Sequence, residues 1–350
     1  MIKNLIIGGG FSAHIFSELL KKDNKETTIL TPKGNIVEHN NMKKNKLFEV
    51  NKISSTKGFS FLTTKYEKRR EIFLHDRVSL GGNSTIWGGV INIEKLPRKF
   101  IDFLDNIKIN LFKLSYEETF SKSNMDSLYQ LRNSKNKIYD SKDYIKTDID
   151  GFATKIFFHK NKIEVEFYDL TSNTTKRIFS EKVFLATSVI QLIEILIKSN
   201  IIKDNYFFEL DEFKHNFKLS FHNKTHNFTD KRVIIKYSIV GAFKHFIGYQ
   251  NKLNYNFRYF NKIPVFIEQT YFNEKQTLLF NLQKNLIKFD KINKFGDSIH
   301  YSDLKINKKK INDFLQSFSK NLFCISMPSA SQKQPGPISN DIIENIKSII

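Results

Sequence analysis

Three consecutive glycines directly after a short apolar run restrict what this chain can fold into more than any other feature. Residues 2–7 have the apolar character of a buried strand, and the glycines at 8–10 end that run in a tight turn. Apolar residues then recur at helical spacing over residues 11–20, and residues 27–31 have the composition of a second strand. The sequence therefore predicts a strand, a turn, a helix and a strand within about thirty residues, the size of a βαβ unit.

The hexapeptide at residues 8–13, Gly-Gly-Gly-Phe-Ser-Ala, fits the dinucleotide-binding pattern G-x-G-x-x-A. In such a turn the first glycine permits the bend, the second lets the backbone approach a pyrophosphate, and the small last residue lets the helix pack close to the strand. The amides and the positive end of the helix then meet the phosphates. The pattern predicts a Rossmann-type domain and five cofactor-binding residues: Gly8, Gly10, Phe11, Ser12 and Ala13.

The end of the second strand lacks the acidic residue that usually accepts hydrogen bonds from the adenosine ribose. Thr31 stands at that place, and Lys33 follows it closely. A threonine hydroxyl can still bond the ribose, so we expect Thr31 to contact the cofactor. Lys33 favours a 2′-phosphate instead, which makes NADP a rival cofactor.

A second glycine-rich segment, residues 79–89, holds four of the fourteen glycines beside the only tryptophan. Taken with the N-terminal turn, it resembles the glucose-methanol-choline (GMC) family of FAD-dependent oxidoreductases. The resemblance favours FAD, and it implies that Gly81, Gly82 and Ser84 face the pyrophosphate while Trp87 and Gly88 lie near the isoalloxazine. The alternative interpretation is a glycine-rich turn with a tryptophan in the core.

A third segment, residues 183–188, reads Val-Phe-Leu-Ala-Thr-Ser and leads from an apolar strand into a helix. Three strand-like runs of a β-meander precede it, at 155–159, 163–168 and 175–179. The segment resembles the later FAD-domain strand of the GMC family, which makes Ala186 a further cofactor-binding residue. Ser188 stands where the family usually has glycine.

These segments predict the α/β fold class, with a Rossmann-type FAD-binding lobe that contains the β-meander and a second antiparallel-sheet (α+β) substrate lobe. Residues 1–202 form the first lobe and residues 203–307 the second in this interpretation. Residues 308–350 are expected to return toward the FAD lobe, but they are short for the strand and helix that the family places there. The remaining expectations are mainly helical structure over 94–135, a helix over 308–321, and strands at 232–240, 254–260, 265–272 and 277–282.

No catalytic residue can be assigned from the sequence. Hydride transfer from an alcohol to a flavin requires a base near the hydroxyl, and GMC enzymes place a histidine for this in their C-terminal segment. Residues 323–337 contain no histidine, and His300 is the nearest one. His215, His222 and His226 lack the spacing and the acidic neighbours of a metal site, so no metal is predicted.

The resemblance implies an FAD-dependent oxidoreductase that acts on a CH–OH group of an alcohol or sugar-like substrate by hydride transfer to the flavin. A catalytically degenerate or truncated FAD- or nucleotide-binding relative without turnover is the first alternative. It is favoured by Thr31, by Ser188, by the absent histidine and by the short C-terminal segment. An NADP-dependent reductase is the second alternative.

The composition limits which binding partners and which cellular compartment we expect for this protein. The net charge of +20 comes from scattered lysines without a basic stripe, so nucleic acid is not an expected partner. A single cysteine, Cys324, excludes an intrachain disulfide and suits a reducing cytoplasm. The longest apolar stretch, residues 183–197, contains Gln191 and Glu194, so no transmembrane segment is expected. Nothing in the sequence indicates an oligomeric state.

Overall fold

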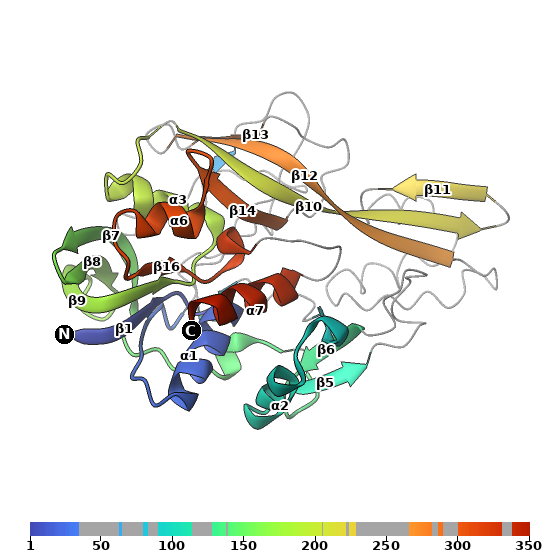
Figure 1. The fold of residues 1–350 in the computed structure, drawn as a ribbon, viewed down its shortest axis with the longest axis horizontal. Coiled ribbons are helices and arrows are strands. Elements are labelled where there is room, and N and C mark those ends of the chain that lie inside the picture. The colour runs from blue at the N-terminus through green and yellow to red at the C-terminus, as the bar shows by residue number, and fades with distance from the viewer. Residues whose placement is uncertain are drawn as a thin grey trace.

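Three β-sheets and their helices make up the part of the chain that the computed structural model describes (Figure 1). The described residues are 1–34, 63–64, 80–82, 90–113, 128–137, 139–204, 206–221, 224–228, 266–281, 286–289, 300–330 and 338–350. One sheet combines parallel and antiparallel strands, and the other two contain mainly antiparallel pairs. The predicted α/β class, with a separate antiparallel sheet after the first lobe, is confirmed.

The first sheet has the strand order β2-β1-β9-β8-β7, with β16 paired to β9. Its strands are β1 (Ile2–Ile7), β2 (Thr28–Leu30), β7 (Gly151–His159), β8 (Lys162–Asp169), β9 (Thr174–Leu185) and β16 (Leu322–Cys324). Strands β2, β1, β9 and β16 run parallel, and β7, β8 and β9 form the predicted antiparallel meander. The carboxyl ends of four parallel strands therefore meet at one edge of this sheet.

Strand β9 belongs to both parts of the sheet. Residues 174–180 pair with β8, whereas residues 183–185 pair with β1 on one side and with β16 on the other. The sequence predicted two separate strands here, at 175–179 and 182–188. A single strand forms instead, because the polar residues between the two apolar runs continue the extended backbone from the meander into the parallel sheet.

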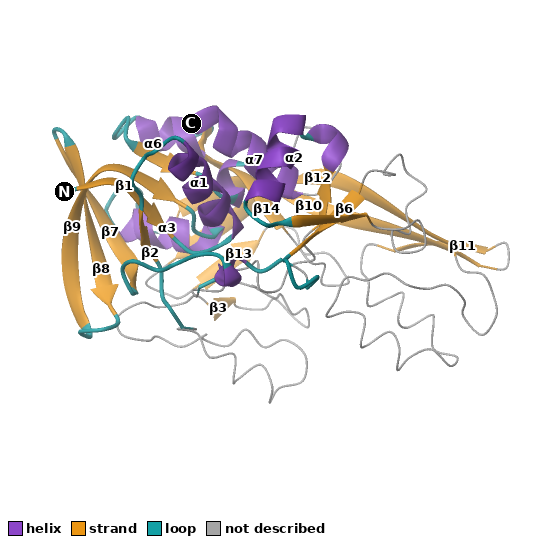
Figure 2. Cartoon of the chain, turned by 90° about the horizontal axis from the view of Figure 1, so that it is seen from below, coloured by secondary structure: helices purple, strands orange, loops and turns teal. Residues whose placement is uncertain are grey.

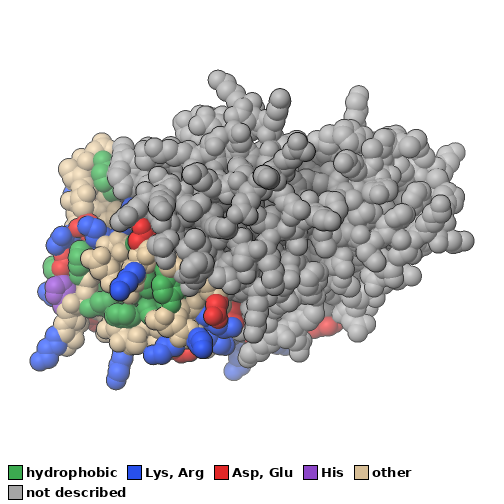
Figure 3. Space-filling model, turned by 90° about the horizontal axis from the view of Figure 1, so that it is seen from above, with side chains coloured by type: hydrophobic (Ala, Val, Ile, Leu, Met, Phe, Trp, Pro, Cys, Tyr) green, Lys and Arg blue, Asp and Glu red, His purple; other side chains and the backbone are tan. Residues whose placement is uncertain are grey.

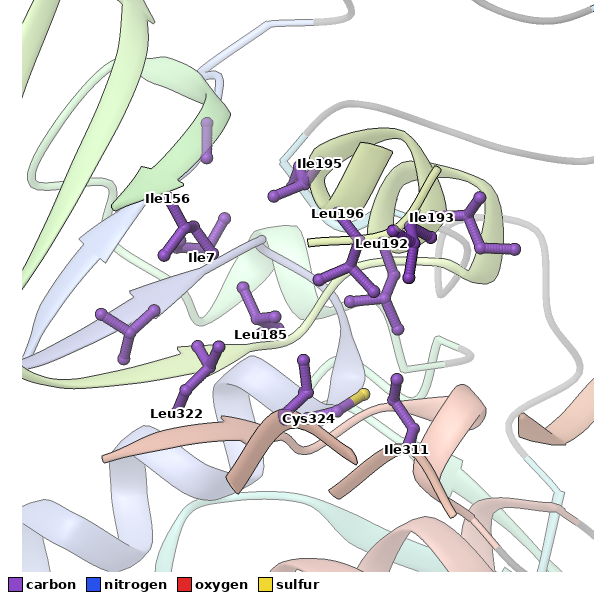
Figure 4. Packing of buried hydrophobic residues seen from close by; sticks show 14 of the residues in the cluster. Ile7, Ile156, Leu185, Leu192, Ile193, Ile195, Leu196, Ile311, Leu322 and Cys324 are labelled. Carbon is purple, nitrogen blue, oxygen red and sulfur yellow. The ribbon is translucent and has the colours of Figure 1, made fainter. Parts of the chain in front are cut away.

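Helices cover both faces of the first sheet. Helices α3 (Val189–Lys198) and α6 (Ile311–Gln316) lie on one face, and α1 (Phe11–Lys22) and α7 (Ile338–Ile349) lie on the other (Figure 1). Because side chains alternate along a strand, Leu5 and Ile7 point into the hydrophobic core beneath α3 and α6, and Ile6 points into the core beneath α1 and α7. Figure 4 shows Ile7 and Leu185 packed beneath α3, on the same side as Cys324.

The C-terminal segment contains a strand and a helix that rejoin the first sheet, so the expectation that it is too short for them is wrong. Strand β16 is three residues long and pairs with β9. Helix α7 lies beside α1 (Figure 2). The side chain of Asn340 in α7 accepts a hydrogen bond from the Asn92 amide at 2.9 Å and donates to the Asn92 carbonyl at 2.7 Å. These bonds fix α7 to the third sheet.

The helix predicted over 308–321 is shorter in the structure. Asn307 and Lys308 have φ of 53° and 64°, and this pair of left-handed residues forms the turn of a hairpin between β14 (His300–Ile306) and β15 (Lys309–Lys310). Residues 308–310, which were predicted to begin the helix, therefore belong to the hairpin. Only Ile311–Gln316 remain helical before the chain turns into β16.

The prediction of mainly helical structure over residues 94–135 is confirmed only in part, and residues 114–127 lie outside the described residues. Among the residues described there, only α2 (Arg98–Asn106) and a short 3-10 turn at Ile93–Lys95 are helical. Lys108, at φ 62°, ends α2 with a left-handed residue, and the Ile109 amide then donates to the Leu104 carbonyl. The chain thus reverses into an antiparallel sheet of order β4-β6-β5: β4 (Val90–Asn92), β6 (Leu128–Arg132) and β5 (Asn110–Lys113).

The largest sheet is built on a long antiparallel ribbon of β10 (Tyr206–Phe221) and β12 (Phe266–Asn281), which extends away from the first sheet (Figure 1). Strand β12 joins the two runs predicted at 265–272 and 277–282. The other strands are β14, β15, β11 (Lys224–Phe228), β13 (Leu286–Phe289) and β3 (Thr63–Thr64). The runs at 232–240 and 254–260 lie outside the described residues, and the domain boundaries at 202 and 307 stay predictions.

The described surface carries mixed charge. Figure 3 shows Lys and Arg side chains interspersed with Asp and Glu over the described part of one face. On the meander, Arg177 pairs with Glu164 and Glu166, at 3.1 Å and 3.0 Å. Among the described residues, no helix has the length and apolar character that crossing a membrane requires.

The packing beneath α3 predicts how two isoleucine substitutions change the stability of the fold. Ile193 in α3 is 0% exposed and Ile350, at the chain end, is 46% exposed, so the two offer a matched pair of substitutions. We expect Ile193→Ala to lower the free energy of unfolding by about 2–5 kcal/mol, because it leaves a cavity in the core. Ile350→Ala should change it by less than about 0.5 kcal/mol. Urea unfolding measures both, and equal losses would contradict this packing.

Candidate functional site

The first glycine of the turn lies against the end of β9. Gly8 has φ 115°, and a Cβ atom there would lie 2.6 Å from the Ala186 carbonyl oxygen. Backbone hydrogen bonds hold this arrangement, since the Gly8 amide donates to Leu30 at 2.9 Å and the Ala186 amide donates to Ile7 at 2.8 Å. Only glycine satisfies both the left-handed backbone and the close approach. The predicted residues Gly8 and Ala186 are therefore neighbours.

The middle glycine packs on the end of β2. A Cβ atom on Gly9 would lie 2.7 Å from the Thr31 hydroxyl oxygen, and Thr31 is only 1% exposed. The structure thus places Thr31 beneath the turn, with its hydroxyl against the Gly9 backbone. In this position Thr31 supports the shape of the turn.

The third glycine presents open backbone at the start of α1. Gly10 has φ −87°, and among the described residues the only atom within 4 Å of an added Cβ would be the Gly81 carbonyl oxygen, at 3.9 Å. No side chain of the described residues caps α1, and its first turn, which includes Phe11, Ser12 and Ala13, contains no acidic residue. A helix start of this kind, with bare backbone before it, fits a phosphate group.

Two glycine segments that are far apart in the sequence meet at this turn. The Gly81 amide donates to the Gly9 carbonyl at 2.9 Å, and Gly81 and Gly82 have φ of 89° and 48°. The hydroxyl of Ser141 lies 3.0 Å from the Gly9 carbonyl oxygen and 3.2 Å from that of Gly81, and donates between them. The structure thus brings together Gly8, Gly10, Gly81 and Ala186. Three further predicted residues, Ser84, Trp87 and Gly88, lie outside the described residues.

A buried histidine and tyrosine fix the segment that carries Ser141. Nδ1 of His14, in α1, lies 2.6 Å from the Tyr139 hydroxyl, and the rings of His14, Tyr139 and Tyr144 stack on one another. Burial, followed by the nearby Lys21 charge, lowers the pKa of His14 to about 3. Burial also raises the pKa of Tyr139 well above its usual value. Both side chains are therefore neutral at physiological pH.

Ser188, which replaces the expected glycine, has a structural role. It is the N-cap of α3, with φ −68°, and its hydroxyl accepts a hydrogen bond from the Gln191 amide at 3.3 Å. The hydroxyl of Ser326, just after β16, donates to the Thr187 carbonyl beside it. The departure from the family pattern is thus compatible with a well-formed helix start.

The histidines considered for catalysis or for a metal site lie on the largest sheet where the structure describes them. His300 begins β14 and pairs with Phe213, and His215 pairs with Tyr271 across the long ribbon. His226 pairs with Leu219, and His222 lies outside the described residues. The described part of the chain contains no cluster of three His, Cys, Asp or Glu side chains that could hold a metal ion.

Sequence reasoning missed three residues of this site: His14, Tyr139 and Ser141. The histidine offered a weak signal, because it lies in an apolar helix directly after the turn. Tyr139 and Ser141 offered none, since only the tertiary fold brings their segment to the glycines.

Comparisons with known proteins find solved structures that match this chain at low identity and low TM-score. No family model matches the sequence, and no curated protein matches it. A flavoprotein/dehydrogenase structure from Cytophaga hutchinsonii matches at 9% identity and TM-score 0.32, over 78% of this chain and 66% of its own. The structure of p-nitrophenol 4-monooxygenase from Pseudomonas putida matches at 6% identity and TM-score 0.34, over 80% of this chain and 69% of its own. The structure of pyridoxine 4-oxidase from Mesorbium loti matches at 9% identity and TM-score 0.36, over 62% of this chain and 59% of its own. This chain therefore spans less than two thirds of the first and third structures.

The left-handed backbone of Gly8 predicts that alanine at two glycine positions changes the stability of the fold by different amounts. We expect Gly8→Ala to lower the free energy of unfolding by about 1–3 kcal/mol or more, because a methyl group at φ 115° is strained and displaces the Ala186 carbonyl. Gly34→Ala is the control, since among the described residues nothing lies within 4 Å of its added Cβ. Its effect should stay within about 0.5 kcal/mol. Chemical denaturation of both variants measures this, and a stable Gly8→Ala protein would disprove the turn geometry.

Burial of neutral His14 predicts a loss of stability in acid. The pKa of His14 is 6.5 in the unfolded chain and about 3 in the folded one, so between these values the unfolded state binds more protons. His14 therefore makes stability fall as the pH drops through this window, by up to about 1.4 kcal/mol per pH unit.

The test compares the unfolding free energy of the wild type with that of His14→Gln, which cannot titrate, between pH 8 and pH 5. The wild type should lose more stability than the variant below about pH 6.5. If the unfolding free energies of the two proteins fell equally with pH, His14 would not be held neutral in the folded state.

Proposed function

We propose that this chain binds FAD along the carboxyl edge of β2, β1 and β9 and uses it to oxidise a CH–OH group of an alcohol or sugar-like substrate. One observation carries the proposal: the bare backbone of Gly10 stands at the start of α1, directly beside a second glycine segment at Gly81 and Gly82. In open α/β sheets, ligands bind at the carboxyl ends of the strands.

The residues present fit a diphosphate. Two glycine segments lie next to each other, and the positive end of α1 directly follows the first of them. In this proposal the phosphates are held by Gly10, Phe11, Ser12, Ala13, Gly81 and Gly82. Gly8, Thr31 and Ala186 form the wall behind the turn. Ser84, Trp87 and Gly88 are assigned to the flavin end of the site by the GMC resemblance alone.

Bound FAD supplies a two-electron acceptor for hydride. The chain's own contribution is to orient the cofactor through fixed backbone amides and to shield it with the sheet and α1. Pre-organised amides of this kind need no rearrangement when they meet negative charge.

A second candidate function is FAD binding without turnover. The observation that favours it is the absence of histidine from residues 301–350, which include the strand and helix that return to the first sheet. The only thiol in that region, Cys324, is fully buried, and burial raises its pKa. No neutral-pH base is therefore offered by a His or Cys side chain of this segment.

The role of Gly10 can be tested without disturbing the fold. Gly10 has an ordinary negative φ and space around it among the described residues, so Gly10→Ala should melt within about 2 °C of the wild type. The added methyl group would occupy the approach to the diphosphate, and we expect FAD affinity to fall at least about tenfold. Quenching of flavin fluorescence during titration measures the affinity. Unchanged affinity would argue against a diphosphate at this turn.

Turnover separates the two candidate functions. Flavin-loaded protein is mixed anaerobically with a panel of alcohols and sugars, and its visible absorbance is followed. A CH–OH oxidoreductase should bleach with at least one member of the panel, because the flavin becomes reduced. Bound flavin that stays oxidised with every donor, but bleaches with dithionite, supports binding without turnover.

A further inference from the structure

The carboxylate that usually binds the adenosine ribose is missing from the end of β2, and Thr31 does not replace it in the structure. Its side chain is 1% exposed and its hydroxyl lies against Gly9 rather than at the surface. The ribose of a dinucleotide nevertheless needs hydrogen-bond acceptors at the carboxyl end of this strand. A neighbouring element must supply them if the cofactor binds here.

The segment at residues 148–150 lies along the outer edge of β2. Leu30 and Ile149 form a parallel bridge, and the Thr31 amide donates to the Ile149 carbonyl at 3.2 Å. At one end of this contact, the Ile29 amide donates to Asp148 Oδ2 at 2.8 Å. The segment therefore adds one more parallel extension to the sheet, next to the strand that lacks the acid.

Asp150 stands at the carboxyl end of that extension. The Lys33 amide, just beyond β2, donates to Asp150 Oδ1 at 2.9 Å. Neighbouring strands are about 4.8 Å apart, so the Asp150 carboxylate is one strand spacing from the place where the usual acid stands. Its side chain is only partly buried.

A carboxylate has acceptor capacity to spare in this position. Its two oxygens offer about four lone-pair sites, and the Lys33 amide takes one of them. The vicinal 2′- and 3′-hydroxyls of a ribose are two donors on adjacent carbons, which suits the pair of oxygens of one carboxylate.

We propose that Asp150 supplies the carboxylate that β2 lacks and accepts hydrogen bonds from the ribose hydroxyls of the cofactor's adenosine. The inference rests on the proposed function, since a dinucleotide must bind at Gly10 for its ribose to reach Asp150. It also assigns specificity. A carboxylate at this point repels a 2′-phosphate, so it selects FAD over NADP despite the nearby Lys33.

The test uses Asp150→Asn, which keeps an acceptor for the Lys33 amide and removes the charge. Titration with FAD should show roughly ten- to a hundredfold weaker binding than the wild type. The matched control is Asp148→Asn, on the same segment, whose carboxylate accepts the Ile29 amide near the start of β2. It should bind FAD within about twofold of the wild type.

An FAD analogue with 2′-deoxyadenosine provides a readout that a purely structural role would not change. Wild type should bind this analogue roughly tenfold more weakly than FAD, while Asp150→Asn should bind the two with similar affinity. The comparison in wild type needs no variant, so it holds even if the substitution impairs folding.

The outcomes distinguish this inference from the proposed function. Wild type that binds no FAD overturns both. Wild type that binds FAD and the deoxy analogue equally, or Asp150→Asn that binds FAD as tightly as wild type, overturns the role of Asp150 and leaves the FAD site standing. Equal weakening by Asp148→Asn and Asp150→Asn also overturns it.

Discussion

The close approach of β1 and β9 at their carboxyl ends is the constraint on which the rest of the site depends. Gly8 can meet the Ala186 carbonyl only because it has no side chain and takes φ 115°. That bend turns the chain so that Gly9 packs on Thr31 and a partly exposed Gly10 precedes the first residue of α1. The second glycine segment, bonded through Gly81 to Gly9, completes the same surface.

Local patterns were sufficient to predict the framework around this constraint. The apolar run, glycines and helical spacing of residues 2–31 predict β1, α1 and β2, because each element matches its own periodicity. The meander is equally local, since each of its three strands contains one of the strand-like runs at 155–159, 163–168 and 175–179. Gly8 and Gly10 were predicted from the same local signal, although the structure gives them different tasks.

Tertiary contacts decided what the sequence could not show. Strand β16 has three residues and becomes a strand only because β9 offers it a free edge. Lys108 ends α2 through a left-handed backbone that its residue type does not signal. Thr31 was predicted to contact the ribose, but its side chain is buried beneath Gly9, where it supports the glycine turn. The carboxylate of Asp150 lies more than a hundred residues from β2 in sequence, so no local motif could reveal it.

A crystal structure of the FAD complex tests the central claim most directly, because it locates the diphosphate. The account predicts diphosphate oxygens bonded to the first-turn amides of α1, between Gly10 and Gly81, with the adenosine directed toward the end of β2. A diphosphate held by any other element, or a flavin nucleotide bound away from Gly10, would contradict it.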